Sequence, residues 1–182
     1  MARQHGVTST TFTEIIIDSG AVYKNYGESG QALLGATRGG NTFTIETEYR
    51  EMEVDGARGA VKSGRRITGV VCSVVANFLA IDKDTILQNL TGAAAADITT
   101  HYRITRSLQL TDSAYLTNVA IVGEVPGKTN SVICRIDNAI SDAGFEFAFT
   151  DKDETILATT FKAHFDPSDL DTEPWAISYP QT

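Results

Sequence analysis

The residues of this sequence that could support catalysis are its three histidines, His5, His101 and His164. A histidine can act as a general acid or base near neutral pH, but it needs a partner group within hydrogen-bond reach. The three lie far apart in the sequence, and none belongs to a zinc-protease, serine-hydrolase or phosphate-loop motif. We therefore do not expect an enzyme, and we interpret His164, between Phe161 and Phe165, as a strand residue.

A short acidic stretch is the only candidate for metal binding that the sequence offers. Asp151, Asp153 and Glu154 are close together, but they lack the ligand spacing and the glycine of a calcium-binding loop. We interpret them as the solvated tip of a hairpin between two strands, and we expect no metal and no cofactor.

Charge order in residues 41–66 suggests a different chemistry, which is docking. Residues 41–55 hold five acids and one base, a net charge of −4, and residues 56–66 hold four bases and no acid, a net charge of +4. One reading is the solvated tip of a hairpin. The other is a self-complementary element, in which opposite charges on one copy orient the next copy.

These charges lie on a predicted β-hairpin that spans residues 41–81. Its first arm alternates, with Phe43, Ile45 and Tyr49 on one face, which is typical of a strand that is buried on one side. Its second arm, residues 67–81, has no charge and is apolar on both faces, so both faces should be covered. The opposite face of the first arm carries Thr42, Thr44, Glu46 and Glu48.

Short alternating segments predict that most of the remaining chain forms strands. Asp82 can cap a helix of about two turns that ends at Gly92, and the alanine run 93–96 then serves as a connection. We expect the ordered pattern to end at Asp166 and Pro167. The other predicted strands are residues 14–18, 31–36 (ended by Gly39 and Gly40), 99–110, 118–125, 131–136, 144–150 and 156–165. The pattern predicts a mainly β fold, a β-sandwich or partly closed barrel with one short helix and a long hairpin loop.

The composition narrows the possible classes of function. The chain has 182 residues, 42% hydrophobic and 21% charged, which is ordinary for one globular domain. Its net charge is −8, and residues 137–173, with ten acids and two bases, also sum to −8, so the rest of the chain is neutral. An acidic chain is poorly suited to bind nucleic acid, which requires basic residues. Cys72 and Cys134 lie in apolar runs, and reduced thiols are favoured over a disulfide. Without an apolar leader or spanning segment, we expect a soluble protein made in a cytoplasm.

Four features of the chain, taken in order, resemble the tail tube (major tail) proteins of long-tailed bacteriophages. They are the acidic alternating strand 41–53, the glycine-rich basic loop 56–64, the apolar strand that runs into a helix over residues 70–90, and the closing hairpin 145–167. The resemblance covers about residues 14–167. The segments outside it are interpreted as an N-terminal arm (1–13) and a C-terminal extension (168–182).

The resemblance implies a structural subunit of a virion tail. Relatives form hexameric rings that stack head to tail around a channel, and DNA passes through this channel without specific binding. The implied partners are other copies of the chain, the tail tip or baseplate proteins, the tail terminator and the tape-measure protein, with no membrane. The predicted channel-lining residues are Thr42, Thr44, Glu46 and Glu48, with Ser73 as a weaker candidate. The predicted inter-ring loop consists of Gly56, Ala57, Arg58, Gly59, Ala60, Val61, Lys62, Ser63 and Gly64.

Three other functions stay open at the level of sequence. The tube protein of a contractile injection device has a similar fold. A monomeric β-sandwich module that binds sugars or proteins usually presents several exposed aromatic residues, whereas this chain has one tryptophan. An enzyme built on a β-barrel is the third, and the missing catalytic motif counts against it.

Overall fold

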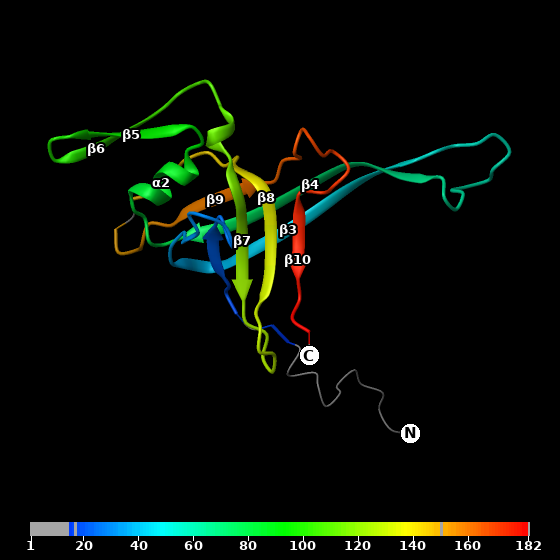
Figure 1. The fold of residues 1–182 in the computed structure, drawn as a ribbon, viewed down its shortest axis with the longest axis horizontal. Coiled ribbons are helices and arrows are strands. Elements are labelled where there is room, and N and C mark those ends of the chain that lie inside the picture. The colour runs from blue at the N-terminus through cyan, green and yellow to red at the C-terminus, as the bar shows by residue number, and fades with distance from the viewer. Residues whose placement is uncertain (1–14, 17, 150, 182) are drawn as a thin grey trace.

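The computed structural model of the chain describes residues 15–16, 18–149 and 151–181 (Figure 1). In this described part, eight strands form one antiparallel sheet in the order β2-β1-β7-β8-β9-β4-β3, with β10 paired to β8, and β5 and β6 form a separate hairpin. The strands are β1 (Ala21–Lys24), β2 (Ala32–Leu33), β3 (Thr37–Glu51), β4 (Arg65–Phe78), β5 (Ala93–Ile98), β6 (His101–Arg106), β7 (Leu116–Gly123), β8 (Val132–Ser141), β9 (Leu157–Lys162) and β10 (Trp175–Ser178). The helices are α2 (Lys83–Asn89) and the short 3₁₀ turn η1 (Asp112–Ala114).

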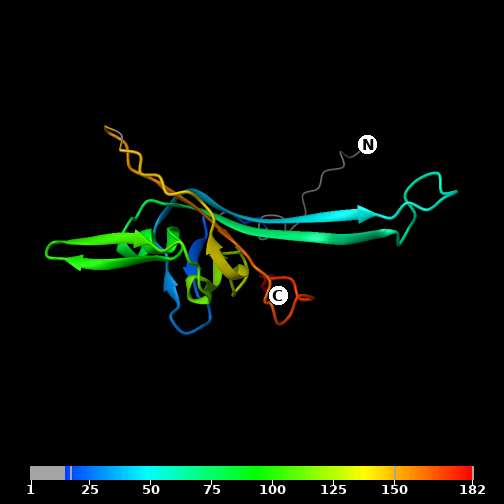
Figure 2. The same ribbon diagram turned by 90° about the horizontal axis from the view of Figure 1, so that it is seen from above.

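The large sheet folds into two layers that enclose the core. In Figure 1, β7, β8 and β10 run across the direction of β3 and β4, and Figure 2 shows the long hairpin lying over the other strands. β8 joins the layers, because its length pairs with β7 and its last residues, Ile140 and Ser141, pair with β9. Fully buried Val119 and Ile136 from one layer meet Val74 and Phe161 from the other. The predicted β-sandwich is confirmed, and within the described residues the sheet does not close on itself.

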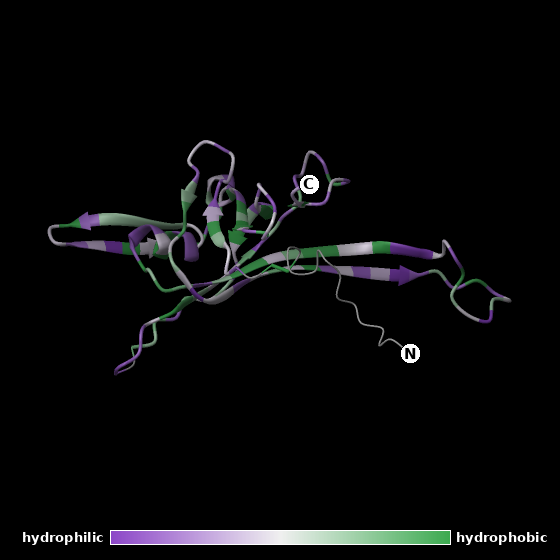
Figure 3. Ribbon diagram, turned by 90° about the horizontal axis from the view of Figure 1, so that it is seen from below, coloured by the Kyte–Doolittle hydropathy of each residue, from purple (hydrophilic) through white to green (hydrophobic). Residues whose placement is uncertain are grey.

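The hairpin β3–β4 is the longest feature of the molecule and extends far beyond the sandwich (Figure 1). The two predicted arms pair as expected, with Phe43 opposite Val74 and Ile45 opposite Cys72. Figure 3 shows the contrast between the arms, since β4 is mostly hydrophobic and β3 mostly hydrophilic. The segment 52–64 connects them at the far end.

The start of β3 differs from the prediction that Gly39 and Gly40 end a strand. β3 begins at Thr37 and continues through both glycines, and the register shifts between Thr37 and Asn41. Gly39 and Gly40 have φ angles of 89° and 86°, a region that other residues rarely adopt. The side-chain amide of Asn41 spans the irregularity by donating to the carbonyl of Ser19 (2.8 Å) and to Thr37 Oγ1 (3.2 Å). The glycines therefore bend the strand without ending it.

Helix α2 follows the prediction made from its cap. Asp82 Oδ1 accepts hydrogen bonds from the backbone N–H of Thr85 (2.7 Å) and from Thr85 Oγ1 (2.8 Å). Both bonds favour the charged carboxylate, so they hold the pKa of Asp82 below its ordinary value. Buried Asn89 ties the end of the helix to β9 by donating to Thr159 Oγ1. The helix is capped by Leu90 and the chain turns at Gly92, which has a φ of 73°.

Three segments depart from the predicted pattern. The alanine run 93–96 is a strand and not a connection, because all four residues pair with β6. Of the predicted strand 144–150, residues 144–149 follow β8 without joining a ladder, and residue 150 lies outside the described part. The ordered pattern does not end at Pro167, since β10 pairs with β8 from Trp175 opposite Ile136 to Ser178 opposite Ile133.

Smaller differences concern strand lengths. β6 stops at Arg106, so residues 107–110 of the predicted strand 99–110 lie outside it, whereas β8 continues to Ser141, beyond the predicted end at residue 136. Of the predicted strand 14–18, residues 15, 16 and 18 are described and are not in a strand, while residues 14 and 17 lie outside the described part. The predicted N-terminal arm, residues 1–13, also lies outside it.

Candidate functional site

The predicted channel-lining residues share the outer face of β3, which points away from the core. Phe43 and Ile45 pack against the core cluster, so the residues between them face the other way. Glu46 and Glu48 are exposed and Thr44 is half-buried. The burial pattern thus agrees with the predicted division of this strand into an apolar and a polar face.

The register adds residues to this face that the sequence left uncertain or missed. Thr44 lies opposite Ser73, which resolves the ambiguous parity of Ser73, and Glu46 lies opposite Val71. Ser73 in turn lies opposite Lys162 of β9, whose ammonium group forms an ion pair with Asp142. The outer face, as we use the term here, consists of Thr42, Thr44, Glu46, Glu48, Val71, Ser73, Val75, Asn77, Ala158, Thr160 and Lys162. Leu157, Thr159 and Phe161 are buried and alternate with Ala158, Thr160 and Lys162. This alternation is the sequence signal that could have assigned the latter three to the outer face.

Tyr49 does not follow the apolar face as predicted. A second register shift lies between Glu48 and Tyr49, and beyond it the hairpin has left the sandwich. The ring of Tyr49 is half-exposed, and the guanidinium carbon of Arg65 lies 3.8 Å from its centre. A cation over the ring partly replaces the missing core contact.

The hairpin tip, residues 52–64, contains the predicted inter-ring loop. Its base is closed by a hydrogen bond from the backbone N–H of Met52 to the carbonyl of Gly64 (2.8 Å). Met52, Val54 and Val61 expose apolar side chains there, and Val54 is 63% exposed. None of the charged side chains of residues 41–66 forms an ion pair within 4.0 Å with another described residue. The opposite charges of this segment are therefore available to another molecule.

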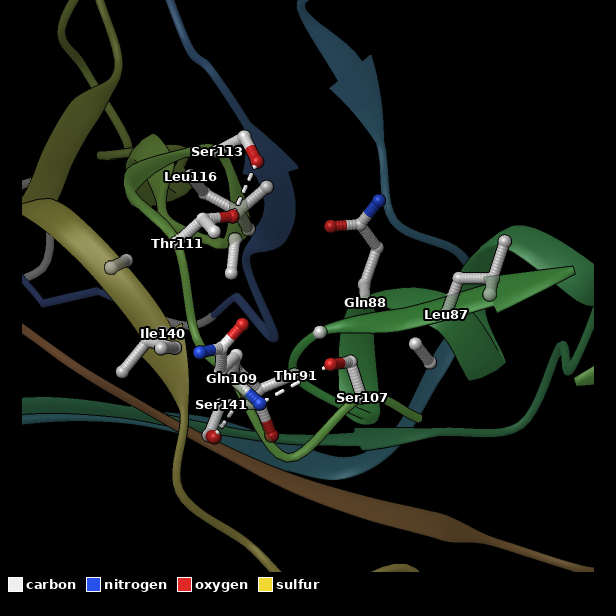
Figure 4. A pocket seen from close by; sticks show the side chains of 14 residues that line it. Leu87, Gln88, Thr91, Ser107, Gln109, Thr111, Ser113, Leu116, Ile140 and Ser141 are labelled. Carbon is white, nitrogen blue, oxygen red and sulfur yellow. Dashed lines mark hydrogen bonds between the residues drawn. The ribbon is translucent and has the colours of Figure 1, made fainter. Parts of the chain in front are cut away.

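A pocket of about 520 Å³ lies beside α2 (Figure 4). Leu87 and Gln88 of the helix, the segment 107–116 and the end of β8 line it. Thr91 Oγ1 donates to the carbonyl of Ser141 (2.7 Å) at its floor, and Thr111 Oγ1 and Ser113 Oγ are hydrogen-bonded at 2.8 Å. The lining is made of hydroxyl, amide and apolar groups, so it supplies no acid or base for catalysis.

The other sequence candidates for chemistry lie on separate elements. His101 starts β6, where its Nδ1 lies 2.7 Å from Thr100 Oγ1, and His164 packs edge-on against Tyr115. His5 is outside the described residues. In the acidic loop, Asp153 and Glu154 form ion pairs with Arg38, and the described residues contain no group of three His, Cys, Asp or Glu side chains placed to hold a metal.

The two cysteines are free thiols. Cys72 is buried in the core, and burial together with the nearby charge of Glu173 raises its pKa to about 11. Cys134 is half-buried, and burial raises the pKa of its thiol as well. Raised pKa values leave both as weak nucleophiles at neutral pH.

Comparison with solved structures identifies chains of similar fold. One, from the virion of a native gene transfer agent particle, matches with a TM-score of 0.50 and 8% identity over 88% of this chain and 96% of that chain. A chain from the tail of an empty particle of this kind, refined with C6 helical symmetry, gives 0.49 and 10% over 90% and 96%. A chain from the tube-terminating cap of the anti-feeding prophage gives 0.46 and 10% over 98% and 94%.

No protein-family model and no curated protein sequence matches this chain. At 8% identity the likeness to the virion chain is one of fold, and it extends over nearly the whole of both chains. The chain therefore has the fold of a virion component, as the sequence resemblance implied. No helix among the described residues is long and apolar enough to cross a membrane.

Proposed function

We propose that this chain is the subunit of a tail tube, in which hexameric rings stack around a channel for DNA. The observation that carries the proposal is the outer face of β3, β4 and β9. It is a broad sheet surface with the core behind it, it holds hydroxyls, carboxylates and few apolar groups, and Val71 at its centre is 45% exposed. The likeness in fold to a chain of a gene transfer agent virion supports the same assignment.

Ring closure would use the two free edges of this layer. Among the described residues, β3 pairs with β4 only, so its other edge is unsatisfied. At the opposite edge, the segment 142–149 contacts β9 at its start and the residues before β9 further on. The N–H of Asp142 donates to the carbonyl of Thr160 in β9 (2.9 Å), and Thr155 Oγ1 donates to the carbonyl of Ala148 (2.9 Å). A free edge is a hazard in a monomer, but in a ring the β3 edge of one copy can pair with the 142–149 edge of the next.

The aromatic side chains of this second edge fit such a joint. Phe145 packs against the core, and Phe147 follows with ring centres 4.6 Å apart. Phe149 continues the row and is 89% exposed. Strand pairing with a neighbouring copy would give these residues the ladder that they lack in the single subunit and would cover the exposed rings.

The outer face would then form the channel wall. A wall of hydroxyl and carboxylate groups repels phosphates, whereas a basic wall would bind them more tightly with each contact. Thr42, Thr44, Glu46 and Glu48 provide such groups, and the one cation of the face, Lys162, is neutralised by Asp142. In this arrangement DNA passes without specific binding.

The hairpin tip would contact the adjacent ring, and the ends of the tube would meet the tail tip, the terminator and, inside, the tape-measure protein. Electron microscopy of the purified protein tests the assignment. We expect rings with six-fold symmetry, or tubes of such rings. A monodisperse monomer at every concentration, without association with a tail-tip complex, would overturn it.

A further inference from the structure

The β5–β6 hairpin is covered on one face only. On the first face, Ala95 and Ile104 lie opposite each other and are half-buried beside α2, and Lys83 Nζ of the helix lies 4.7 Å from the ring centre of Tyr102. The second face is exposed at every position. We call it the alanine face, and it consists of Ala94, Ala96, Ile98, His101, Arg103 and Thr105.

This exposure is unusual for a two-stranded sheet. An isolated hairpin is marginally stable in water and needs packing on a face to persist. On its β5 side the alanine face presents the methyl groups of Ala94 and Ala96, which leave room for larger apolar side chains to pack close to the backbone. Its cation, Arg103, forms no ion pair with any described residue.

The position of the alanine face indicates what covers it. The β5–β6 hairpin and the tip of the β3–β4 hairpin lie at opposite ends of the longest axis of the molecule (Figures 1 and 2). When a copy is repeated head to tail along this axis, the tip of one copy meets the β5–β6 end of the next.

The two surfaces are complementary in chemistry as well as in position. The tip exposes the apolar side chains of Met52 and Val54, and the alanine face offers the methyl groups of Ala94 and Ala96. Glu53 and Asp55 are sequence neighbours of these residues in a segment outside any strand, and neither they nor Arg103 form an ion pair with another described residue.

We propose that the alanine face of the β5–β6 hairpin is the receptor for the hairpin tip of a second copy in the adjacent ring. Met52 and Val54 pack on Ala94 and Ala96, and the acids beside them pair with Arg103. The inference rests on the tube function proposed above and specifies which surface the inter-ring loop contacts.

Disulfide cross-linking between singly substituted subunits tests the contact. Val54→Cys protein and Ala96→Cys protein, each in a Cys134→Ser background, are mixed, assembled and treated with a mild oxidant that accepts the two electrons of disulfide formation. We expect a cross-linked dimer in assembled material and none in dispersed subunits. Ala95→Cys is the matched control, because Ala95 is adjacent in sequence but faces α2, and it should not cross-link.

The outcomes separate this inference from the tube function. Assembled tubes in which Ala96→Cys cross-links no more than Ala95→Cys would overturn the receptor assignment and leave the tube intact. Failure of the parent protein to form any ring or tube would count against the tube function itself. As a second variant, Arg103→Glu should reduce the yield of stacked rings at least tenfold while single rings persist, and Glu53→Arg in the same chain should restore part of it. Normal stacking by Arg103→Glu protein would contradict the charge pairing.

Discussion

Glu46 lies directly opposite Val71 in the β3–β4 ladder, and both side chains point away from the core. The charge of the Glu46 carboxylate repels anions that approach this surface. The outer face differs in this respect from the hairpin tip, which holds two bases, Arg58 and Lys62, as well as acids.

Replacing the acids of the outer face should slow the passage of DNA. In a Glu46→Lys, Glu48→Lys double variant, we expect tubes to assemble and DNA ejection to slow several-fold, most strongly at low salt, because basic groups bind phosphate by releasing counterions. Ejection can be followed by DNA-dye fluorescence in reconstituted particles. Glu28→Lys, an exposed acid in a turn outside the outer face, should eject at the parent rate. Ejection at the parent rate by the double variant would refute the channel assignment.

Shortening the hairpin tip should separate folding from stacking. Deletion of residues 57–63 removes exposed residues only, so we expect a folded subunit that forms single rings and no tubes. Reversal of Arg58 and Lys62 to Glu should weaken stacking most at low salt, because exposed charges are screened beyond about 10 Å at 0.1 M salt. Sedimentation and electron microscopy distinguish the two assemblies. Normal tubes from the deletion variant would show that residues 57–63 have no part in stacking.

Adjacent residues of β9 should differ sharply in their effect on stability. Phe161 is buried in the core, and Phe161→Ala should lower the free energy of unfolding by about 3–5 kcal/mol. Lys162 lies on the outer face, and the loss of its half-exposed ion pair in Lys162→Ala should cost about 1 kcal/mol or less. Urea unfolding of the dispersed subunits measures both. Equal losses would mean that the assignment of faces on β9 is wrong.

The cap of α2 should make stability depend on acid. Hydrogen bonds from Thr85 lower the pKa of Asp82 in the folded state, so the carboxylate contributes stability that is complete above the ordinary aspartate pKa and is lost as pH falls through the lowered folded value. Asp82→Ala should destabilise by about 1 kcal/mol at pH 7. The difference from the parent should shrink below about pH 4. A difference that is unchanged at pH 3 would contradict this role of the charge.

The parts of the fold that depend on local chemistry could be predicted from the sequence. The alternation of Phe43 and Ile45 with polar residues gave the correct faces of β3, because a strand places successive side chains on opposite sides. Asp82 marked the start of α2, because a carboxylate before a helix satisfies N–H groups that have no partner within it. Both signals lie within a few residues of the structure that they specify.

The parts that depend on distant partners could not be predicted. Alanine has little preference for strands, and residues 93–96 are extended because β6 pairs with them. The phenylalanines of residues 145–149 have the alternation of a strand but no ladder partner in the single subunit. β10 pairs with β8, beginning with Trp175 opposite Ile136, although the C-terminal segment shows no strand pattern in the sequence. For the candidate site, the sequence identified the charges of the hairpin, whereas Val71 and Lys162 required the register.

The placement of the long hairpin and the β5–β6 hairpin at opposite ends gives the molecule a front and a back. A line of copies joined front to back has a direction, and its two extremities present different chemistry, exposed tips at one and alanine faces at the other. A protein that fits one extremity cannot fit the other. Starting and stopping such a line therefore require two unlike proteins. A short peptide that copies the hairpin tip could block the extremity with exposed alanine faces, and a peptide that copies the alanine face could block the extremity with exposed tips.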